Sequence, residues 1–486
     1  MAQTPETDTA GVPVQRAAGH VRRESILRER ARRVVAASGP PTLTFSQPSR
    51  ESGLAAETER SVLDLVLRVG EAMIATGAPV ADVTAALLRL AAGYGVTNCH
   101  VDITFISISA SIDREDDPIT KMRVITVRTS DYSRMADLFA MVDEVAAGKL
   151  PLERAHGRLE QVLRTPHPYR RWVVTLALGV MAAGISGLLG GGWLVALVAA
   201  TTTIVIDRTL RVLRRWGLPY LFQQAAGATI ATLVAILILW GQDMFGWDRS
   251  ALPPSLVVAS GIVVLLAGMQ LVGAAEDAIS GYPLTAAAKS FEVALYTVGL
   301  VVGIGFMLDL GRRLGIPLYI GDVFGSAPAG LVQIACGAVI AGAWAVASYT
   351  RARSVPIIML VGAVAAGLYF AIGALWLGPG GSAFFAALGV GLLAGVIGDR
   401  GRLPSMVISV CGVTPMLPGL SIYAAMFSFI EAGDMIGGAQ LAVRALSVGL
   451  ALAAGVTLGE FVATPLRSEM DRWERRVRRR ARGARI

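Results

Sequence analysis

The sequence has 486 residues, of which 54% are hydrophobic and only 16% are charged, and its mean hydropathy is +0.57. A chain this apolar is typical of a membrane protein and excludes a wholly soluble globular one. The formal net charge of +8 could indicate nucleic-acid binding, but the arginines concentrate at the two ends and beside apolar segments, as membrane topology requires. We therefore expect no nucleic-acid partner.

The three cysteines, Cys99, Cys336 and Cys411, lie far apart in the sequence. Their spacing supports neither a disulfide framework nor a zinc or redox site. The chain also lacks the Gly-x-x-x-x-Gly-Lys-Ser/Thr run of a phosphate-binding loop. We therefore expect no metal and no other cofactor.

Residues 1–55 are rich in Pro, Ser, Thr, Ala and Arg without a sustained hydrophobic period, which predicts a disordered basic tail. This segment begins without the apolar core of a signal peptide, which favours a cytoplasmic amino end. From residue 57 to 93 apolar side chains recur at helical spacing, and Gly77-Ala78-Pro79 interrupts them. Two packed helices are expected here.

Alternating apolar and small polar residues predict two strands, at 97–112 and 122–128, joined by the acidic loop 113–118. Helical spacing returns at 135–147 and again at 152–163. The helices and strands together predict a small cytoplasmic α/β domain over residues 56–168.

Arg170 and Arg171 open the strongly apolar part of the chain. Each apolar run that follows is near the length of about 20 residues that a helix needs to cross a bilayer. The ten runs are 172–190, 193–207, 218–240, 255–275, 291–309, 328–349, 355–377, 382–398, 404–430 and 437–462. Lys and Arg concentrate in alternate loops, on the side of the amino-terminal domain, so both chain ends are expected in the cytoplasm.

A diverged internal repeat is indicated in the apolar part. The run from Gly261 to Gly268 in the fourth span aligns with the run from Gly412 to Gly419 in the ninth, and one more span follows each. This predicts two five-span halves, residues 169–310 and 311–463, which have opposite topology because five is odd.

Residues 464–486 form a polybasic tail that we expect to be cytoplasmic. It contains Trp473 among its arginines. Such a tail beside a membrane span is attracted to anionic lipid headgroups, so we expect it to anchor the chain end at the membrane surface.

The ninth span contains Pro415 and Pro418. Each proline removes a backbone donor and clashes with the preceding turn, and unwound backbone inside a membrane is tolerated only within protein or beside a watery cavity. Secondary transporters place substrate sites at such broken helices; the alternative is a kink that only shapes packing. The candidate substrate-binding residues are Thr414, Pro415, Met416, Leu417, Pro418, Gly419, Ser421, Tyr423, Gly261, Gly268 and Gln270.

Ionisable residues within membrane spans are costly and tend to face the protein interior or water. Those in the predicted spans, or at their edges, are Glu276, Asp277, Lys289, Glu292, Arg444 and Glu460. The first four have two open interpretations. They form either a charge cluster at the membrane edge or carboxylates at a cavity mouth, which pass a proton or hold an ammonium group. Glu460 could be interfacial, and Arg444 can extend to the membrane surface.

Four runs in this order resemble the threonine/serine exporter family over about residues 58–463: His100 to Thr104, Leu189 to Trp193, Ala259 to Gly268 and Thr414 to Gly419. The resemblance implies a bacterial inner-membrane exporter with a cytoplasmic amino-terminal domain and ten spans. It would move L-threonine and L-serine outward at the expense of the proton gradient. Split relatives in the same family are associated with dicarboxylate export, so that substrate class stays open.

The family's cytoplasmic domain has been likened to a hydrolase, which draws attention to His100, Asp102 and Thr104. Alternate residues of a strand point to the same face, so these side chains could form part of a hydrolytic site. No nucleophile in a strained turn is evident, and the same face could equally contact the membrane part or form a polar gate. We expect no enzymatic activity; a membrane-anchored hydrolase is the alternative. The sequence does not decide between a monomer and a homo-oligomer.

Overall fold

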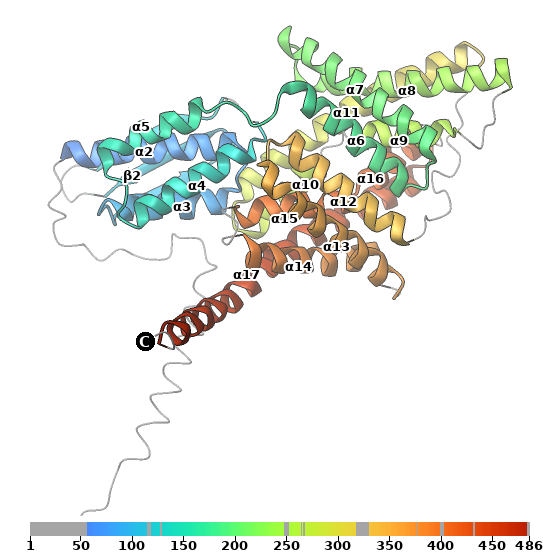
Figure 1. The fold of residues 1–486 in the computed structure, drawn as a ribbon. Coiled ribbons are helices and arrows are strands. Elements are labelled where there is room, and N and C mark those ends of the chain that lie inside the picture. Colours follow the sequence, from blue (N-terminus) through green and yellow to red (C-terminus); the bar gives the residue numbers. More distant parts are fainter. Residues whose placement is uncertain are drawn as a thin grey trace, which may run out of the picture. The chain divides into compact units, whose positions relative to one another are not determined.

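The computed structural model describes residues 56–113, 118–126, 129–246, 252–263, 265, 268–316, 330–375, 377–398, 403–430 and 433–483 (Figure 1). The tail expected over residues 1–55 lies outside the described residues, as does most of the acidic loop 113–118. The described residues are mostly helical, with one three-stranded sheet near the amino end.

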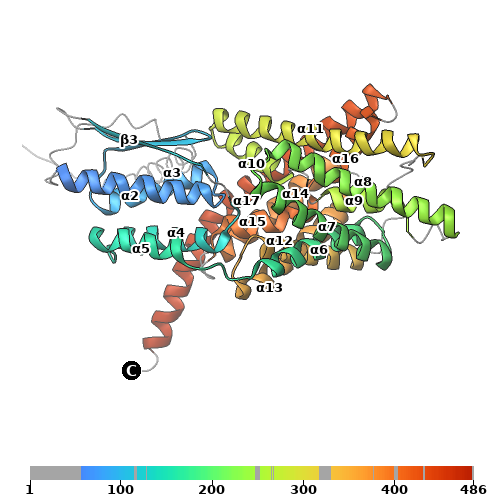
Figure 2. The ribbon, with the colours of Figure 1, turned by 90° about the horizontal axis from the view of Figure 1, so that it is seen from above.

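The amino-terminal part, residues 56–168, has three layers. Its elements are α2 (Ala56–Ala75), α3 (Val80–Gly93), β1 (Cys99–Ile103), β2 (Ser107–Ile112), β3 (Ile119–Val124), α4 (Tyr132–Ala146) and α5 (Leu152–Arg164). Helices α2 and α3 pack on the sheet on one side and on α4 and α5 on the other (Figure 2). The expected break between α2 and α3 is present, with Gly77 at a φ of 98° and Pro79 before the first turn of α3.

The prediction of a single strand over 97–112 is wrong, because this segment folds back on itself as β1 and β2. The three strands form an antiparallel sheet in the order β1-β2-β3. The Thr104 amide donates to the Ser107 carbonyl at 2.9 Å, which leaves Phe105 and Ile106 at the turn. Two-residue hairpin turns usually contain Gly, Asn or Asp, so this apolar turn was not recognised.

Eight described helices are long and apolar enough to cross a membrane. They are α6 (Arg171–Leu188), α7 (Trp193–Arg215), α8 (Tyr220–Phe245), α11 (Pro283–Arg313), α12 (Gly330–Ala347), α13 (Val355–Gly373), α14 (Pro379–Ile397) and α17 (Met435–Gly483). Helix α13 follows a short 3-10 turn at Ala352–Ser354. Helix α17 continues through Pro465, so the segment expected as a tail begins as part of this helix.

The other two expected spans, 255–275 and 404–430, each contain two shorter helices. The first contains α9 (Pro254–Val263) and α10 (Gly268–Ile279). The second contains α15 (Ser405–Val413), the 3-10 turn Thr414–Met416 and α16 (Gly419–Ile430). None of these helices is long enough to qualify alone, so the count of ten spans stays a prediction.

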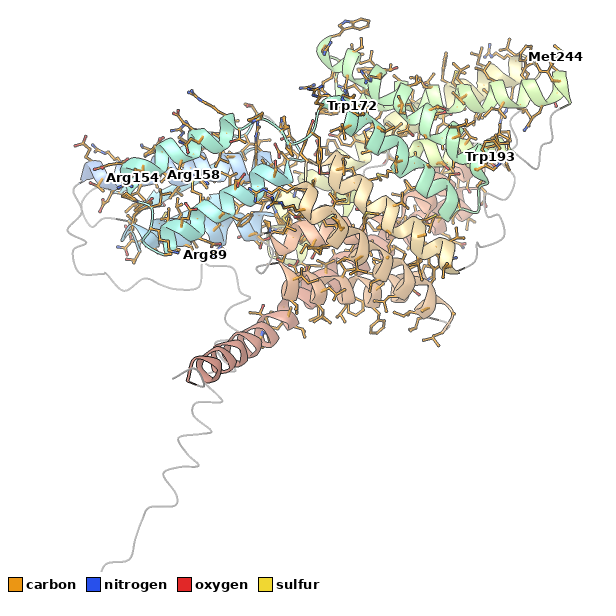
Figure 3. The ribbon with its side chains drawn as sticks, in the orientation of Figure 1. Arg89, Arg154, Arg158, Trp172, Trp193 and Met244 are labelled. Carbon is orange, nitrogen blue, oxygen red and sulfur yellow. The ribbon has the colours of Figure 1, made fainter. Side chains whose placement is uncertain are left out.

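The outer surface of the long helices is apolar. Figure 3 shows Trp172, Trp193 and Met244 on this surface, where they are 56%, 76% and 61% exposed. Side chains of this type are rarely so exposed in water-soluble proteins, whereas lipid accommodates them. By contrast, Arg154 and Arg158 project from α5 of the amino-terminal part (Figure 3).

Most of the helices in the apolar part form two groups, each with its own buried core, while α6 packs on α12 in a smaller third cluster. The first bundle consists of α7, α8, α9 and α11, with Ile262 and Leu300 in its core. The second bundle consists of α12, α13, α14, α15 and α17, whose core continues into the amino-terminal part. Val272 of α10 belongs to the core of the second bundle, whereas Ile422 of α16 packs against the first. Each divided span therefore passes from one bundle to the other.

Glycines allow α14 and α17 of the second bundle to pack closely. A Cβ atom added at Gly455 would lie 2.4 Å from the Phe384 carbonyl oxygen, and one at Gly459 would lie 2.4 Å from that of Leu388. Small residues at helix contacts are typical of membrane bundles, where close backbone approach drives association. Helices α14 and α17 are therefore closely packed, and α10 contacts α17 of this bundle.

Candidate functional site

A cavity of about 1340 Å³ lies between the two bundles and reaches the amino-terminal part. Its wall includes Thr104 and Tyr132 of the amino-terminal part, Gln224 of α8 and Arg444 near the start of α17. The volume exceeds the range of roughly 300–1,000 Å³ that is usual for small-molecule pockets. A small solute would therefore occupy only part of this cavity.

The ends of three short helices, α10, α15 and α16, meet at the wall of this cavity. Thr414, which follows the last residue of α15, is buried and donates from Oγ1 to the Val410 carbonyl at 3.0 Å. The same hydroxyl contacts the sulfur of Met269, the second residue of α10, at 3.9 Å. Met269, Thr414 and Pro418 all line the cavity. The starts of α10 and α16 therefore lie beside the same space.

Most of the candidate substrate-binding residues line this cavity. They are Gln270 and the set Thr414, Pro415, Met416, Leu417, Pro418, Gly419 and Ser421. Gly268 begins α10, and Gly261 packs against Ala231 and Thr202 of the first bundle. The side chain of Tyr423 lies outside the described part of the chain.

The adjacent carboxylates of Glu276 and Asp277 have different surroundings. Glu276 lines the cavity. Asp277 is 1% exposed, and its Oδ2 lies 2.6 Å from Nζ of Lys289. Its Oδ1 accepts from the backbone amide of Val80 at 3.4 Å, at the positive amino end of α3. Asp277 therefore holds the amino-terminal part to α10 and α11, while Glu276 remains open to the cavity.

The other predicted charged residues are distributed along the membrane helices. Glu292 lines the cavity and accepts from the Tyr296 hydroxyl. Glu460 of α17 accepts from Ser409 of α15 at 2.6 Å and is not among the cavity-lining residues. Glu460 therefore joins two helices of the second bundle.

A polar cluster on α6 and α7 was missed by the sequence analysis. Thr175 donates to Oδ2 of Asp207 at 2.8 Å, and Arg211 donates from Nε to Oδ1 of Asp207 at 3.3 Å. Asp207 and Arg211 line the cavity because α7 continues to Arg215, past its expected end at residue 207. The spacing of four between them is a signal for a helical ion pair.

Several contacts fasten the amino-terminal part beside the cavity. The Tyr132 amide donates to the Ser348 carbonyl at 3.0 Å, and Arg351 pairs with Asp137 of α4. His167 stacks on Tyr349 with ring centroids 4.3 Å apart. The turn between α12 and α13 thus contacts the start of α4 and the segment before α6.

Asp82 lies in the first turn of α3, close to this junction. It keeps contact with solvent, yet the surrounding protein displaces enough water to raise the pKa of its carboxyl to about 6. The charge of Arg89 lowers this pKa and that of Asp277 raises it, each by less than the loss of water. Asp82 therefore takes up a proton at a higher pH than an ordinary aspartate.

The structure does not assemble a catalytic site from His100, Asp102 and Thr104. His100 and Asp102 are exposed on the outer face of β1, and in the described part of the chain no hydrogen bond joins them. Thr104 lines the cavity, and its hydroxyl is 2.6 Å from that of Ser107, across the turn between β1 and β2. The described residues contain no group of three His, Cys, Asp or Glu side chains suited to a metal.

The eight long apolar helices and the cavity between the bundles indicate a multi-pass helical membrane protein. A family model described as "Putative threonine/serine exporter" matches residues 64–311, and a second, "Threonine/Serine exporter, ThrE", matches residues 333–462. The chain belongs to the threonine/serine exporter family. No solved structure matches it.

Two curated relatives cover most of the chain. One is a "Probable threonine/serine exporter" of Mycobacterium tuberculosis, 39% identical over 84% of this chain and 77% of the relative. The other is a "Threonine/serine exporter" of Corynebacterium glutamicum, 34% identical over 84% of this chain and 83% of the relative. A "Probable succinate transporter subunit YjjP" of Escherichia coli is 23% identical over 52% of this chain and 96% of its own length. Because the family members are named exporters, the expectation that the chain is not an enzyme is confirmed.

The ion pair between Asp277 and Lys289 generates a stability prediction. Lys289→Met leaves the Asp277 carboxylate buried without its cation, which we expect to lower the free energy of unfolding by about 3 kcal/mol. Adding Asp277→Asn to this variant removes the unpaired charge and should restore most of the loss. The measurement is the thermal unfolding midpoint of the full-length protein in detergent. Equal midpoints for the single and double variants would contradict this role.

Proposed function

We propose that the protein is a secondary active exporter of L-threonine and L-serine across the bacterial inner membrane, with both chain ends in the cytoplasm and the proton gradient as energy source. The observation that carries this proposal is the contact between Thr414 and Met269, which brings the starts of α10 and α16 to one cavity. The names of the two relatives that cover 84% of this chain support the substrate class.

The starts of the short helices are suited to the substrate carboxylate. The first turn of a helix has backbone N–H groups without partners inside the helix, and the helix dipole adds positive charge at the same end. Such ends are ready-made anion sites. In this proposal the turn from Thr414 to Gly419 and the first turn of α10 bind the carboxylate.

Glu276 is the best candidate for proton coupling, because it faces the cavity while Asp277 is held by Lys289 and α3. Glu276 lies six residues after Gln270 in the same helix, a rise of about 9 Å. This separation suits a proton carrier beside the substrate better than a direct ligand. Protonation of Glu276 would remove a negative charge from the cavity during each cycle.

A dicarboxylate exporter is the second candidate, favoured by three further cations in the cavity wall. Arg171, Arg211 and Arg214 line the cavity in addition to Lys289 and Arg444. They lie among Asp207, Glu276 and Glu292, so the wall is mixed in charge, which suits a zwitterion better than a dianion. The distant similarity to a succinate transporter subunit keeps this alternative in the test.

We propose that the carboxyl-terminal end of the chain binds the membrane surface. The polybasic tail, residues 464–486, would bind anionic lipid, since clustered arginines are attracted to such headgroups. Binding of the purified protein to vesicles with and without anionic lipid, before and after removal of residues 467–486, tests this role. Equal binding in all four cases would contradict it.

Efflux from loaded cells tests the proposed function. Labelled threonine and serine should leave cells that express the protein, and an uncoupler should stop this efflux, while labelled succinate should remain. Glu276→Gln, and separately Pro415→Ala with Pro418→Ala, should abolish efflux at unchanged membrane levels. The matched control is Asp309→Asn, an exposed acid of α11 outside the cavity lining. Normal efflux by both test variants would refute the mechanism, and efflux of succinate alone would select the second candidate.

We further propose that the amino-terminal part gates the cavity through the contact of α4 with the turn between α12 and α13. Cysteines at Asp137 and Arg351, joined by a short bifunctional thiol reagent, should reduce efflux at least tenfold by preventing separation. The control is the same cross-link between cysteines placed at Arg89 and Asp143, which form an exposed ion pair within the amino-terminal part. Equal efflux of both cross-linked proteins would show that the two parts need not separate.

A further inference from the structure

Gln270 and Ser421 occupy equivalent positions in the two divided spans. Gln270 is the third residue of α10, which begins at Gly268, and Ser421 is the third residue of α16, which begins at Gly419. The two glycines are also the last residues of the runs that align in the sequence, so Gln270 and Ser421 fall at the same offset in both. Both side chains line the cavity.

Several other polar groups in the cavity wall are already bonded within the protein. Thr414 donates to the Val410 carbonyl, and the Tyr296 hydroxyl donates to Glu292. In the described part of the chain, neither the Gln270 amide nor the Ser421 hydroxyl has a hydrogen-bond partner. Gln270 is exposed and Ser421 is partly buried, so both side chains can bond water or a solute in the cavity.

We propose that Gln270 and Ser421 recognise the side-chain hydroxyl of the substrate, with Gln270 as the main specificity-determining residue. This inference rests on the proposed function, since it concerns the substrate that the helix starts hold. An amide has both a donor and an acceptor group, and a hydroxyl can satisfy both. The apolar side chains of Met269 and Met416 also line the cavity and would contact the methyl group of threonine.

Valine is the informative comparison because it has nearly the shape of threonine with a methyl group in place of the hydroxyl. A site built to bond a hydroxyl rejects the analogue that lacks it, because its own polar groups are left unpaired. A purely apolar pocket would distinguish the two amino acids only weakly. The ratio of threonine to valine transport therefore reports on Gln270 and Ser421 directly.

The test uses the full-length protein in proteoliposomes, with labelled threonine or valine inside. The wild-type protein should favour threonine strongly, and Gln270→Met, which keeps the side-chain length, should reduce the threonine-to-valine ratio about tenfold or more, mainly by admitting valine. Ser421→Ala should reduce the ratio by a smaller factor. The matched control is Gln224→Met, a second cavity-lining glutamine whose amide oxygen also lacks a partner in the described part of the chain. Because Gln224 lies in α8 and not at the start of a short helix, this variant should keep the wild-type ratio.

A second measurement covers the case in which Gln270→Met transports neither solute. The increase in unfolding temperature that threonine and valine produce in each purified protein reports binding without transport. Threonine alone should stabilise the wild-type protein and the Gln224→Met control, whereas both amino acids should affect Gln270→Met equally. A wild-type preference retained by Gln270→Met in both assays overturns this inference and leaves the exporter proposal standing. A wild-type protein that neither binds nor moves threonine or serine overturns both.

Discussion

Backbone groups inside a lipid bilayer have no water to bond, so a helix can end there only against protein or beside a wet cavity. Helices α10, α15 and α16 satisfy this constraint together, since Thr414 contacts Met269 and both line one cavity. The divided spans also connect the two bundles, because Val272 belongs to one core and Ile422 packs against the other. Any movement of one bundle against the other must therefore change the geometry where substrate is proposed to bind.

The adjacent residues Glu276 and Asp277 have different surroundings, and this difference cannot be seen in the sequence. Asp277 is buried against Lys289 and the amino end of α3, whereas Glu276 borders the cavity. A buried charge is tolerated only when it is well paired. The contacts of Asp277 with Lys289 and Val80 therefore connect the amino-terminal part to α10 and α11. This link joins α3 of the amino-terminal part to α10, the helix that contains the proposed proton carrier.

The helix break at Pro415 and Pro418 could be predicted from the sequence, because each proline lacks the backbone N–H that a continuous helix needs. The division of residues 255–275 carries no such signal, because glycine only weakens a helix. The hairpin turn at Phe105 and Ile106 lacks the usual turn residues. Contacts such as Val80 with Asp277 join positions far apart in the chain, so no local pattern indicates them.

Solvent access at the start of α16 tests the central claim most directly. The measurement is the rate at which a water-soluble thiol reagent labels a cysteine placed at Ser421, in the full-length protein with Cys99, Cys336 and Cys411 replaced. We predict labelling from the aqueous phase that slows when threonine is added and is unaffected by valine. A cysteine that remains unlabelled, or is labelled at the same rate with threonine present, would contradict a wet site at the meeting point of the short helices.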